Sequence, residues 1–523
     1  MSDTAVGNVP AARGDIDRRA EMVSQGMGLA WWAGVQPDRL AIVSPSGDRS
    51  FAELNASANR LVRALRARGV VAGDAVALVC GNRPAFVETV AACQRSGLRL
   101  TPINWHLTGQ EAGYIASDCE AKVVIGDATL AECVEGAVAA APQATVRLAV
   151  GGPLAGFESY EAAVAAEAGE DIDDPTPGGS MLYTSGTTGR PKGVRRPPAA
   201  AGAVNLYGYE EGGQDMHLCT GPLYHAAPLA FSLAAPLAWG VGVVLMEQWD
   251  AEEALSLIAR YRITHTHMVP TMFHRLLSLT PEVRSQYDIS SLRFVLHGAA
   301  PCPAAVKSAL IDWIGPIVWE YYAATEGAGT FCDSATWLLK PGTVGKPVDG
   351  QVIVGDEQGA ELPAGDTGLL YLKAPAAGRF EYYKDEAKTA GTYRGDYFTL
   401  GDVGHMDADG FLFITDRSAN LIITGGVNVY PAEVDAVLLE HPAVGDVATI
   451  GVPNPEWGEE VKAVVELQPG TPATPALAEE LIAFCRSRLA RFKCPRTVDF
   501  VATLPRQDNG KIYKRLLRDR YRD

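Results

Sequence analysis

The chain has 523 residues, of which 47% are hydrophobic and 20% charged, and it carries a formal net charge of −17. This length exceeds what one hydrophobic core serves, so we expect two or more domains with an ordinary globular composition. The excess of acidic groups argues against nonspecific binding to nucleic acid or to anionic lipid.

The cysteines and the N-terminal residues indicate where the protein works. The nine cysteines form no Cys-x-x-Cys pair, which predicts buried thiols in a reducing compartment and neither disulfides nor a zinc site. The first twenty residues are polar, so we expect no signal peptide. No uninterrupted apolar run is long enough to span a bilayer, and we therefore expect a cytoplasmic protein.

From residue 40 onward, short apolar runs alternate with amphipathic segments. Ser50-x-x-Glu53 is a capping box that predicts the start of a helix, and Pro84–Ser96 predicts a second helix that begins at proline. This alternation of strands with helices predicts parallel sheets covered by helices. The predicted strands are Leu40–Val43, Val76–Cys80, Leu98–Thr101, Val123–Ile125, Val241–Met246, Ile263–Val269 and Leu292–Leu296.

The character of the chain changes past Gly342. Short apolar runs such as Gly368–Lys373 and Gly410–Thr415 lie between Gly/Asp turns, which is typical of a β-rich subdomain. From Arg417 onward, short strands and helices alternate again and predict a small separate α/β domain. We expect a large N-terminal domain over residues 1–415 and a small C-terminal domain over residues 416–523.

One loop has the composition of an anion-binding segment. The apolar run Met181–Tyr183 leads into a stretch rich in glycine and hydroxyl groups that ends on Lys192. Glycines let backbone N–H groups approach an oxyanion, and the lysine adds positive charge. The spacing differs from that of a Walker A loop. Taken alone, a flexible surface hairpin is an equal alternative.

Three further polar patches follow predicted strands, at Gly221–His225, His297–Pro301 and Tyr321–Glu326. In α/β sheets, ligands bind beyond the carboxyl ends of the strands, so these patches are candidates for one site.

In this order, the patches resemble the adenylate-forming superfamily, which includes acyl-CoA ligases, firefly-type luciferases and peptide-synthetase adenylation domains. The loop ending at Lys192 is similar to the phosphate loop of that family, and Ala323 replaces the usual glycine of its Tyr-Gly-x-Thr-Glu motif. The remaining matching motifs are Tyr322–Glu326, Tyr397–Asp402, Asp416–Arg417 with Ile423–Glu433, and Pro505–Arg506 with Gly510–Lys511.

The resemblance implies roles for individual residues in the binding of ATP, Mg²⁺ and CoA. Thr325 would bind the α-phosphate, and Glu326, together with Thr184, would hold Mg²⁺. The residues implied for the β- and γ-phosphates are Thr184, Ser185, Gly186, Thr187, Thr188, Gly189 and Lys192. Those implied for the adenosine part are Gly298, Ala299, Ala300, Pro301, Tyr321, Tyr322, Ala323, Asp402, Ile414 and Arg417.

The resemblance also implies that the C-terminal domain is mobile. It would rotate about Asp416, so that Lys511 serves acyl-AMP formation and the Gly425–Gly426 loop then lines a pantetheine tunnel. His225 would line the acyl tunnel. The plain alternatives are a core histidine at 225, a solvated acid at 326 and a solvated basic tail around 511.

These observations predict an acyl-CoA ligase that activates an apolar carboxylic acid, either a fatty acid or a related ring-bearing acid. The alternatives are transfer to a carrier-protein phosphopantetheine, nucleotide binding without turnover, and a luciferase-like oxygenation. The oligomeric state stays open, with a homodimer as one alternative. Lys511 is a candidate for acetylation, which would remove its charge.

Overall fold

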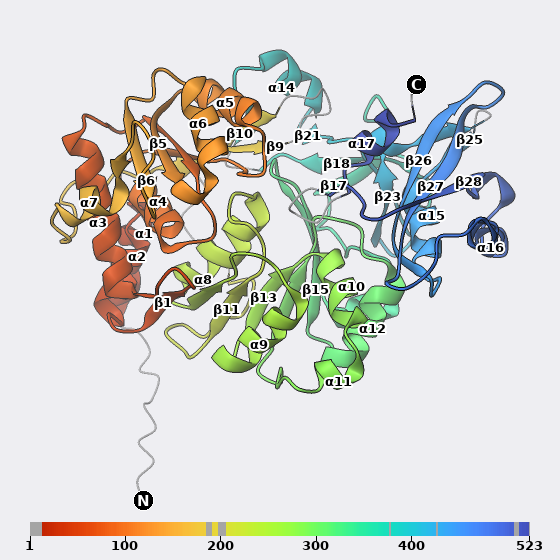
Figure 1. Ribbon diagram of the computed structural model, residues 1–523, viewed down its shortest axis with the longest axis horizontal. Helices are drawn as coiled ribbons and strands as arrows, with labels where there is room; N and C mark the ends of the chain where they lie inside the picture. Colours follow the sequence, from red (N-terminus) through yellow and green to blue (C-terminus); the bar gives the residue numbers. More distant parts are fainter. Residues whose placement is uncertain are drawn as a thin grey trace, which may run out of the picture. The chain divides into compact units, whose positions relative to one another are not determined.

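The computed structural model describes residues 13–184, 191–196, 205–375, 378–424, 427–506 and 512–521. They form two compact units, a first unit that ends at Trp249 and a second unit that begins at Asp250 (Figure 1). Among the described residues, no helix is long and apolar enough to cross a membrane.

The first unit contains a six-stranded sheet in which every pairing is parallel, in the order β7-β6-β5-β3-β4-β8. The central strand β3 is buried along its whole length, as expected for a sheet covered on both faces. The strands are β3 (Ala75–Val79), β4 (Arg99–Pro102), β5 (Ala121–Asp127), β6 (Val146–Val150), β7 (Glu158–Ser159) and β8 (Gly179–Ser180).

A second group of strands in this unit has the order β11-β12-β1-β2. The pairings of β12 with β11 and with β1 are parallel, whereas β2 runs antiparallel to β1. The strands β9 and β10 pair antiparallel with each other. The bounds are β1 (Leu40–Val43), β2 (Arg49–Ser50), β9 (Leu182–Thr184), β10 (Lys192–Arg195), β11 (Met216–Cys219) and β12 (Gly242–Leu245).

Two helices of the first unit, α3 and α4, begin where the sequence predicts. The Ser50 hydroxyl accepts a hydrogen bond from the Glu53 backbone N–H, and the Glu53 carboxylate accepts one from the Ser50 N–H, so the predicted capping box opens α3. Proline begins α4, as predicted. The helices are α1 (Arg13–Ser24), α2 (Gly28–Val35), α3 (Phe51–Ala67), α4 (Pro84–Arg95), α5 (Gly109–Asp118), α6 (Ala131–Ala139), α7 (Tyr160–Ala165) and α8 (Ala235–Ala238).

The second unit opens with three parallel strands, β13 (His265–Met268), β14 (Phe294–His297) and β15 (Val318–Ala323). β16 (Ala328–Cys332) returns antiparallel to β15. Because β13, β14 and β15 are parallel, their carboxyl ends share one edge. The helices of this part are α9 (Ala251–Tyr261), α10 (Pro270–Ser278), α11 (Pro281–Arg284), α12 (Ala304–Ile314) and α13 (Ser334–Leu339).

The predicted β-rich segment past Gly342 is confirmed as an antiparallel sheet with the order β20-β21-β18-β22-β23, and β17 pairs with β18. A short helix, α14 (Glu386–Thr392), precedes β20. The strands are β17 (Val352–Gly355), β18 (Gly368–Lys373), β20 (Tyr393–Arg394), β21 (Tyr397–Phe398), β22 (Asp402–Met406) and β23 (Leu412–Arg417).

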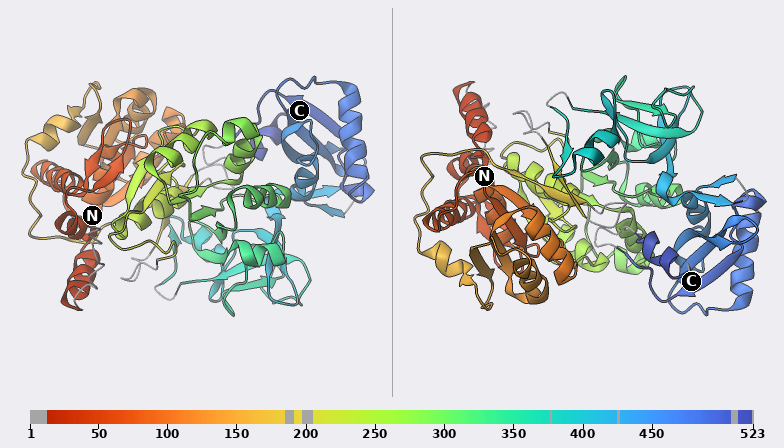
Figure 2. Two further views of the ribbon diagram at one scale, coloured as in Figure 1. Left: turned by 90° about the horizontal axis from the view of Figure 1, so that it is seen from below. Right: turned by 90° about the horizontal axis from the view of Figure 1, so that it is seen from above.

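The C-terminal part forms its own sheet, in the order β25-β24-β27-β26, with β28 parallel to β27 (Figures 1 and 2). A separate cluster of buried apolar side chains lies between this sheet and its helices, and Val434 and Leu481 belong to it. The elements are β24 (Ile422–Thr424), β25 (Val427–Val429), α15 (Pro431–Leu438), β26 (Val444–Asn454), β27 (Gly458–Leu467), α16 (Pro475–Arg486), β28 (Thr497–Val501) and α17 (Lys514–Asp519). The predicted boundary between residues 415 and 416 falls inside β23 and stays a prediction.

A buried ion pair joins α12 to β15. The Lys307 ammonium lies 2.7 Å from the Glu320 carboxylate, and the Lys307 side chain is fully buried while 9% of the Glu320 side chain is exposed. The ring of Trp337 lies 5.0 Å from the ammonium. Burial raises the pKa of Glu320, and the charge of Lys307 opposes that rise. The pair therefore fixes the helix that follows the Gly298–Pro301 loop onto the strand that carries Tyr321 and Tyr322.

We expect Lys307→Met to destabilise the second unit by about 3–5 kcal/mol, because it leaves the carboxylate of Glu320 buried without its cation. The double variant Lys307→Met/Glu320→Met removes both charges at similar volume and should recover most of that loss. Thermal unfolding of the parent chain and both variants measures the effect. A single variant as stable as the parent would contradict this assignment.

Candidate active site

Three of the residues predicted for the adenosine part, Tyr322, Asp402 and Arg417, meet at the Asp402 carboxylate. Its Oδ2 accepts a hydrogen bond from the Tyr322 hydroxyl at 2.8 Å, and its Oδ1 accepts one from Arg417 Nε at 3.0 Å. Asp402 and Arg417 are direct partners across β22 and β23. Asp402 is 6% exposed, whereas 46% of the Arg417 side chain reaches solvent. Three segments separated in sequence therefore meet at one carboxylate.

This arrangement shapes the chemistry of the tyrosine and of the carboxylate. Burial, and then the charge of Asp402, raise the pKa of Tyr322 well above its usual value, so its phenol stays protonated and donates. Each oxygen of Asp402 keeps a further lone pair, so the carboxylate can accept two more hydrogen bonds from a diol. The positions suit a ring that stacks on a base beside a carboxylate that binds a ribose.

Glu326 lies just beyond β15 and is 7% exposed, which excludes the plain alternative of a solvated surface acid. The Tyr382 hydroxyl donates to its Oε1 at 2.9 Å. Tyr382 lies on the two-residue strand β19 (Glu381–Tyr382), beside the ring of Phe380. Sequence reasoning missed Tyr382, because one tyrosine in an aromatic run carries no signal of a partner 56 positions away.

The donor set around Glu326 fits one kind of metal site. Among the described residues, no group of three or more His, Cys, Asp or Glu side chains is placed to hold a metal ion. Glu326 offers a single buried carboxylate with one oxygen held by Tyr382. Mg²⁺ is commonly held by one or two carboxylates together with substrate phosphates, and this set suits such an ion.

The Gly298–Pro301 loop follows β14 at the same sheet edge. A Cβ on Gly298 would lie 2.6 Å from the Tyr321 ring, so glycine is required there. Ala299 adopts a left-handed conformation with φ +67°, which is uncommon outside glycine. The Tyr321 hydroxyl lies 3.1 Å from His267 Nε2, which ties this part of β15 to β13.

In the first unit, Lys192 and Thr184 are direct partners across the β9–β10 pair, so the two described ends of the predicted phosphate loop face each other. Ser185, Gly186, Thr187, Thr188 and Gly189 lie outside the described residues.

His225 also belongs to the first unit. It is half-buried, and its ring lies 4.6 Å from that of Tyr224. Tyr224 in turn meets the ring of Trp105 edge-on at 6.4 Å. The side chain of Asn82, which is buried, donates to the Gly221 carbonyl oxygen at 3.0 Å and so orders the loop before His225. Trp105 and Asn82 were not predicted, because they lie more than a hundred residues before the loop they contact.

The predicted hinge residue Asp416 is buried and holds three donors. Its carboxylate accepts from the backbone N–H groups of Arg417 and Ala432 at 2.6 and 3.0 Å, and from the Asn420 amide at 3.0 Å. Ala432 is in the first turn of α15, so this residue connects β23 to the C-terminal part. Gly425, Gly426 and Lys511 lie outside the described residues, and their roles stay predictions.

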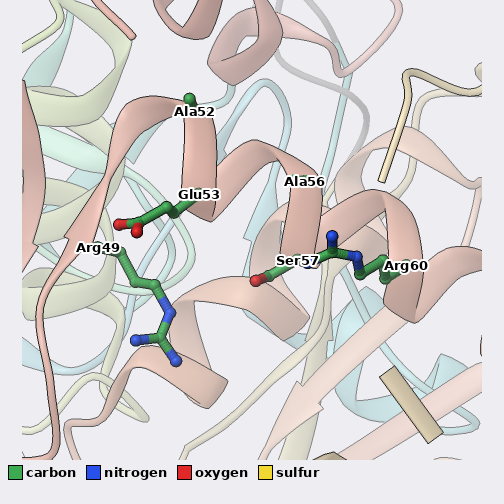
Figure 3. Close-up of a pocket in the computed structure, with 6 residues that line it drawn as sticks. All are labelled: Arg49, Ala52, Glu53, Ala56, Ser57 and Arg60. Atoms are coloured by element: carbon green, nitrogen blue, oxygen red, sulfur yellow. The ribbon is translucent and has the colours of Figure 1, made fainter. Parts of the chain in front are cut away.

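An open hollow lies along α3 of the first unit (Figure 3). Beside it, Arg49 pairs with the buried carboxylate of Glu88 at 3.0 Å. The hollow is lined by Arg49, Ala52, Glu53, Ala56, Ser57 and Arg60. The predicted site residues come from other segments of the chain.

Comparisons with known proteins identify the class. The model of the AMP-binding enzyme family matches residues 29–383, and that of the AMP-binding enzyme C-terminal domain matches residues 433–511. The chain belongs to this family, the adenylate-forming superfamily. Within the superfamily it lies on the acyl-CoA synthetase branch and is an AMP-forming ligase.

Two relatives and one solved structure illustrate this branch. Feruloyl-CoA synthase of an Amycolatopsis species is 34% identical and aligns over 94% of this chain and 99% of its own length. Long-chain-fatty-acid–CoA ligase FadD13 of Mycobacterium tuberculosis is 32% identical and aligns over 94% of this chain and 97% of its own length. The crystal structure of the anthranilate CoA ligase AuaEII in complex with anthranoyl-AMP superposes with a TM-score of 0.85 at 26% identity. The match covers 95% of this chain and 97% of that chain.

We expect stability to depend on pH through His267. Burial lowers the pKa of His267 to about 3. An unfolded histidine takes up a proton near pH 6.5, whereas the buried His267 stays neutral. Above about pH 6.5 the side chain is neutral in both states, so the protein keeps its full free energy of unfolding. As the pH falls from 6.5 toward 3, only the unfolded chain binds the proton, and the free energy of unfolding falls by up to about 1.4 kcal/mol per pH unit.

The variant His267→Gln does not titrate, and its amide can still bond to Tyr321. The stability difference between the parent and this variant should therefore shrink as the pH falls from 7 to 4. Thermal unfolding of both proteins across that range measures it. A difference that is independent of pH would refute the assignment.

Proposed function

We propose that the chain is an acyl-CoA ligase that activates an apolar carboxylic acid with ATP and passes it to CoA. The observation that carries this proposal is the Tyr322–Asp402–Arg417 arrangement, because it offers a stacking ring, a diol acceptor and a cation at one carboxylate. Its position among acyl-CoA synthetases supports the same reaction.

The first step forms acyl-AMP. A carboxylate oxygen of the acid attacks the α-phosphorus of ATP, a new P–O bond forms, and the bond to the β-phosphate breaks to release pyrophosphate. This step needs positioning and charge stabilisation more than covalent help. Thr184 and Lys192 would bind the outer phosphates, Thr325 would bind the α-phosphate, and Lys511 would stabilise charge in the transition state.

The adenosine and metal roles fall to residues of the second unit. Tyr322 would stack on the base against the Gly298–Pro301 loop, and Asp402 would accept hydrogen bonds from both ribose hydroxyls. Glu326, held by Tyr382, would bind Mg²⁺, and the ion would neutralise phosphate charge when bound.

The second step forms the thioester. The sulfur of CoA attacks the acyl carbon, a C–S bond forms, AMP leaves with the electron pair of the broken C–O bond, and the thiol loses its proton. In this step the Gly425–Gly426 loop would line the path of the pantetheine arm. The nine free thiols of the chain support a reducing compartment such as the cytoplasm.

The aromatic side chains near His225 support an apolar substrate. Tyr224, His225 and Trp105 form a chain of ring contacts that suits an aromatic or long aliphatic group. The two relatives described above are named for one acid of each kind, ferulate and a long-chain fatty acid. Ala323 stands where the motif usually has glycine, and its added methyl group would narrow whatever space the acyl group uses.

The substrate class is tested by measuring pyrophosphate release and thioester formation with a panel of acids. Aryl acids, fatty acids of increasing chain length and steroid acids are compared with and without CoA. We expect both products to appear together and to rise with one chemical class. Pyrophosphate without thioester would indicate another acceptor, such as a carrier protein, and binding of ATP without pyrophosphate release would contradict the proposal.

We expect Lys511→Ala to lower the rate of acyl-AMP formation by roughly 100-fold or more, because it removes the charge that faces the developing transition state. Thioester formation from supplied acyl-AMP should change little, since that step does not use this lysine. Rapid-quench assays of the two half-reactions separate the effects. Equal loss in both would contradict the role, and so would full adenylation by a chain acetylated at Lys511.

A further inference from the structure

Arg506 joins two parts of the second unit that are far apart in sequence. Its Nη1 donates to the Thr271 hydroxyl oxygen at 3.2 Å, across 235 positions of the chain. The same guanidinium pairs with the carboxylate of Asp446 in β26. The side chains of Arg506 and Asp446 are 17% and 19% exposed. These contacts are largely shielded from water, unlike most surface ion pairs.

The chain around Arg506 is bound to the C-terminal sheet. Arg506 and Ile512 form an antiparallel bridge, and the Tyr513 N–H donates to the Pro505 carbonyl oxygen at 2.8 Å. The Leu504 N–H donates to the Glu466 carboxylate at 3.0 Å. The two segments that flank residues 507–511 are therefore tied to each other, and Leu504 and Ile512 pack against apolar side chains of β26 and β27.

Thr271 lies near the sheet edge formed by the carboxyl ends of β13, β14 and β15. It is the second residue of α10, which begins directly after β13. The Gly298–Pro301 loop and Glu326 follow β14 and β15, and these strands are parallel to β13. The bond from Arg506 therefore reaches the edge at which the adenosine residues gather.

The guanidinium of Arg506 binds Asp446 more strongly than it binds Thr271. Asp446 offers Arg506 an opposite charge, whereas Thr271 offers a neutral hydroxyl close to a second cation, Arg275. Burial, and then Arg275, lower the pKa of Arg506 to about 10, so it remains charged at neutral pH. If the contact opens, Arg506 stays with Asp446 and releases Thr271.

We propose that Arg506 is a positioning residue for acyl-AMP formation, because its releasable bond to Thr271 holds Arg506, which precedes Lys511 by only a few positions, against α10. The inference rests on the proposed function, in which Lys511 acts in the first half-reaction only. In the second half-reaction Arg506 releases Thr271 while its pair with Asp446 stays intact.

The sharpest test is Thr271→Val, which removes the acceptor at nearly constant volume and leaves the Arg506–Asp446 pair in place. A hydrogen bond to a charged group is involved, so we expect the rate of ATP–pyrophosphate exchange to fall by roughly 10-fold. The KM for ATP and the rate of thioester formation from supplied acyl-AMP should change less than about 2-fold. Ser278→Ala is the matched control, because that hydroxyl donates to the His274 carbonyl oxygen of its own helix.

A double-mutant cycle adds a second test. Arg506→Lys keeps a charge for Asp446 but cannot present the same fork to both partners. If both substitutions break one contact, Thr271→Val should cost little further exchange activity in the Arg506→Lys background.

Additive losses would overturn the inference, and so would equal loss of both half-reactions or unchanged exchange in Thr271→Val. Absence of exchange in the unmodified chain would instead refute the proposed function itself.

Discussion

The candidate site depends on the two hydrogen bonds that the Asp402 carboxylate accepts. Asp402 lies on a strand of the antiparallel sheet, accepts the hydroxyl of Tyr322 from β15, and pairs with Arg417 across β23. A buried carboxylate without such donors is costly, so the charge and the two hydrogen bonds stabilise one another. The same bonds bring a ring, an acceptor and a cation within reach of one nucleotide.

Close packing fixes the Gly298–Pro301 loop at the carboxyl end of β14. Gly298 lies against the Tyr321 ring and leaves no room for a Cβ, and Ala299 takes a left-handed conformation. Beneath the loop, the buried pair of Lys307 and Glu320 holds α12 to β15. Such a pair specifies a position more than it adds stability, because desolvation offsets much of the attraction between the charges. The loop is thereby presented on a rigid base.

The C-terminal part combines an apolar core of its own with a few polar contacts to the preceding part of the second unit. Apolar side chains such as Val434 and Leu481 pack inside it, so it keeps its fold whichever surface it presents. Asp416 binds the first turn of α15 through a backbone N–H, and Arg506 reaches α10 through a neutral hydroxyl. These polar contacts are weak compared with the apolar core, which suits the movement proposed for this part in the two half-reactions.

Local patterns in the sequence determined the helix starts at Ser50 and Pro84, the parallel sheets, the β-rich segment past Gly342 and the order of the nucleotide motifs. These features depend on neighbours a few residues apart, and hydrophobic periodicity and capping groups report such neighbours directly. The motif residues Tyr322, Asp402 and Arg417 were predicted for one site, and the structure brings their side chains together.

Only the tertiary structure decided that Tyr382 holds Glu326, that Asn82 orders the loop before His225, and that Arg506 reaches Thr271. Each of these contacts joins residues more than fifty positions apart through one or two hydrogen bonds. A tyrosine, an asparagine or an arginine has the same local pattern whatever its distant partner, so only the packing of sheets and helices selects that partner.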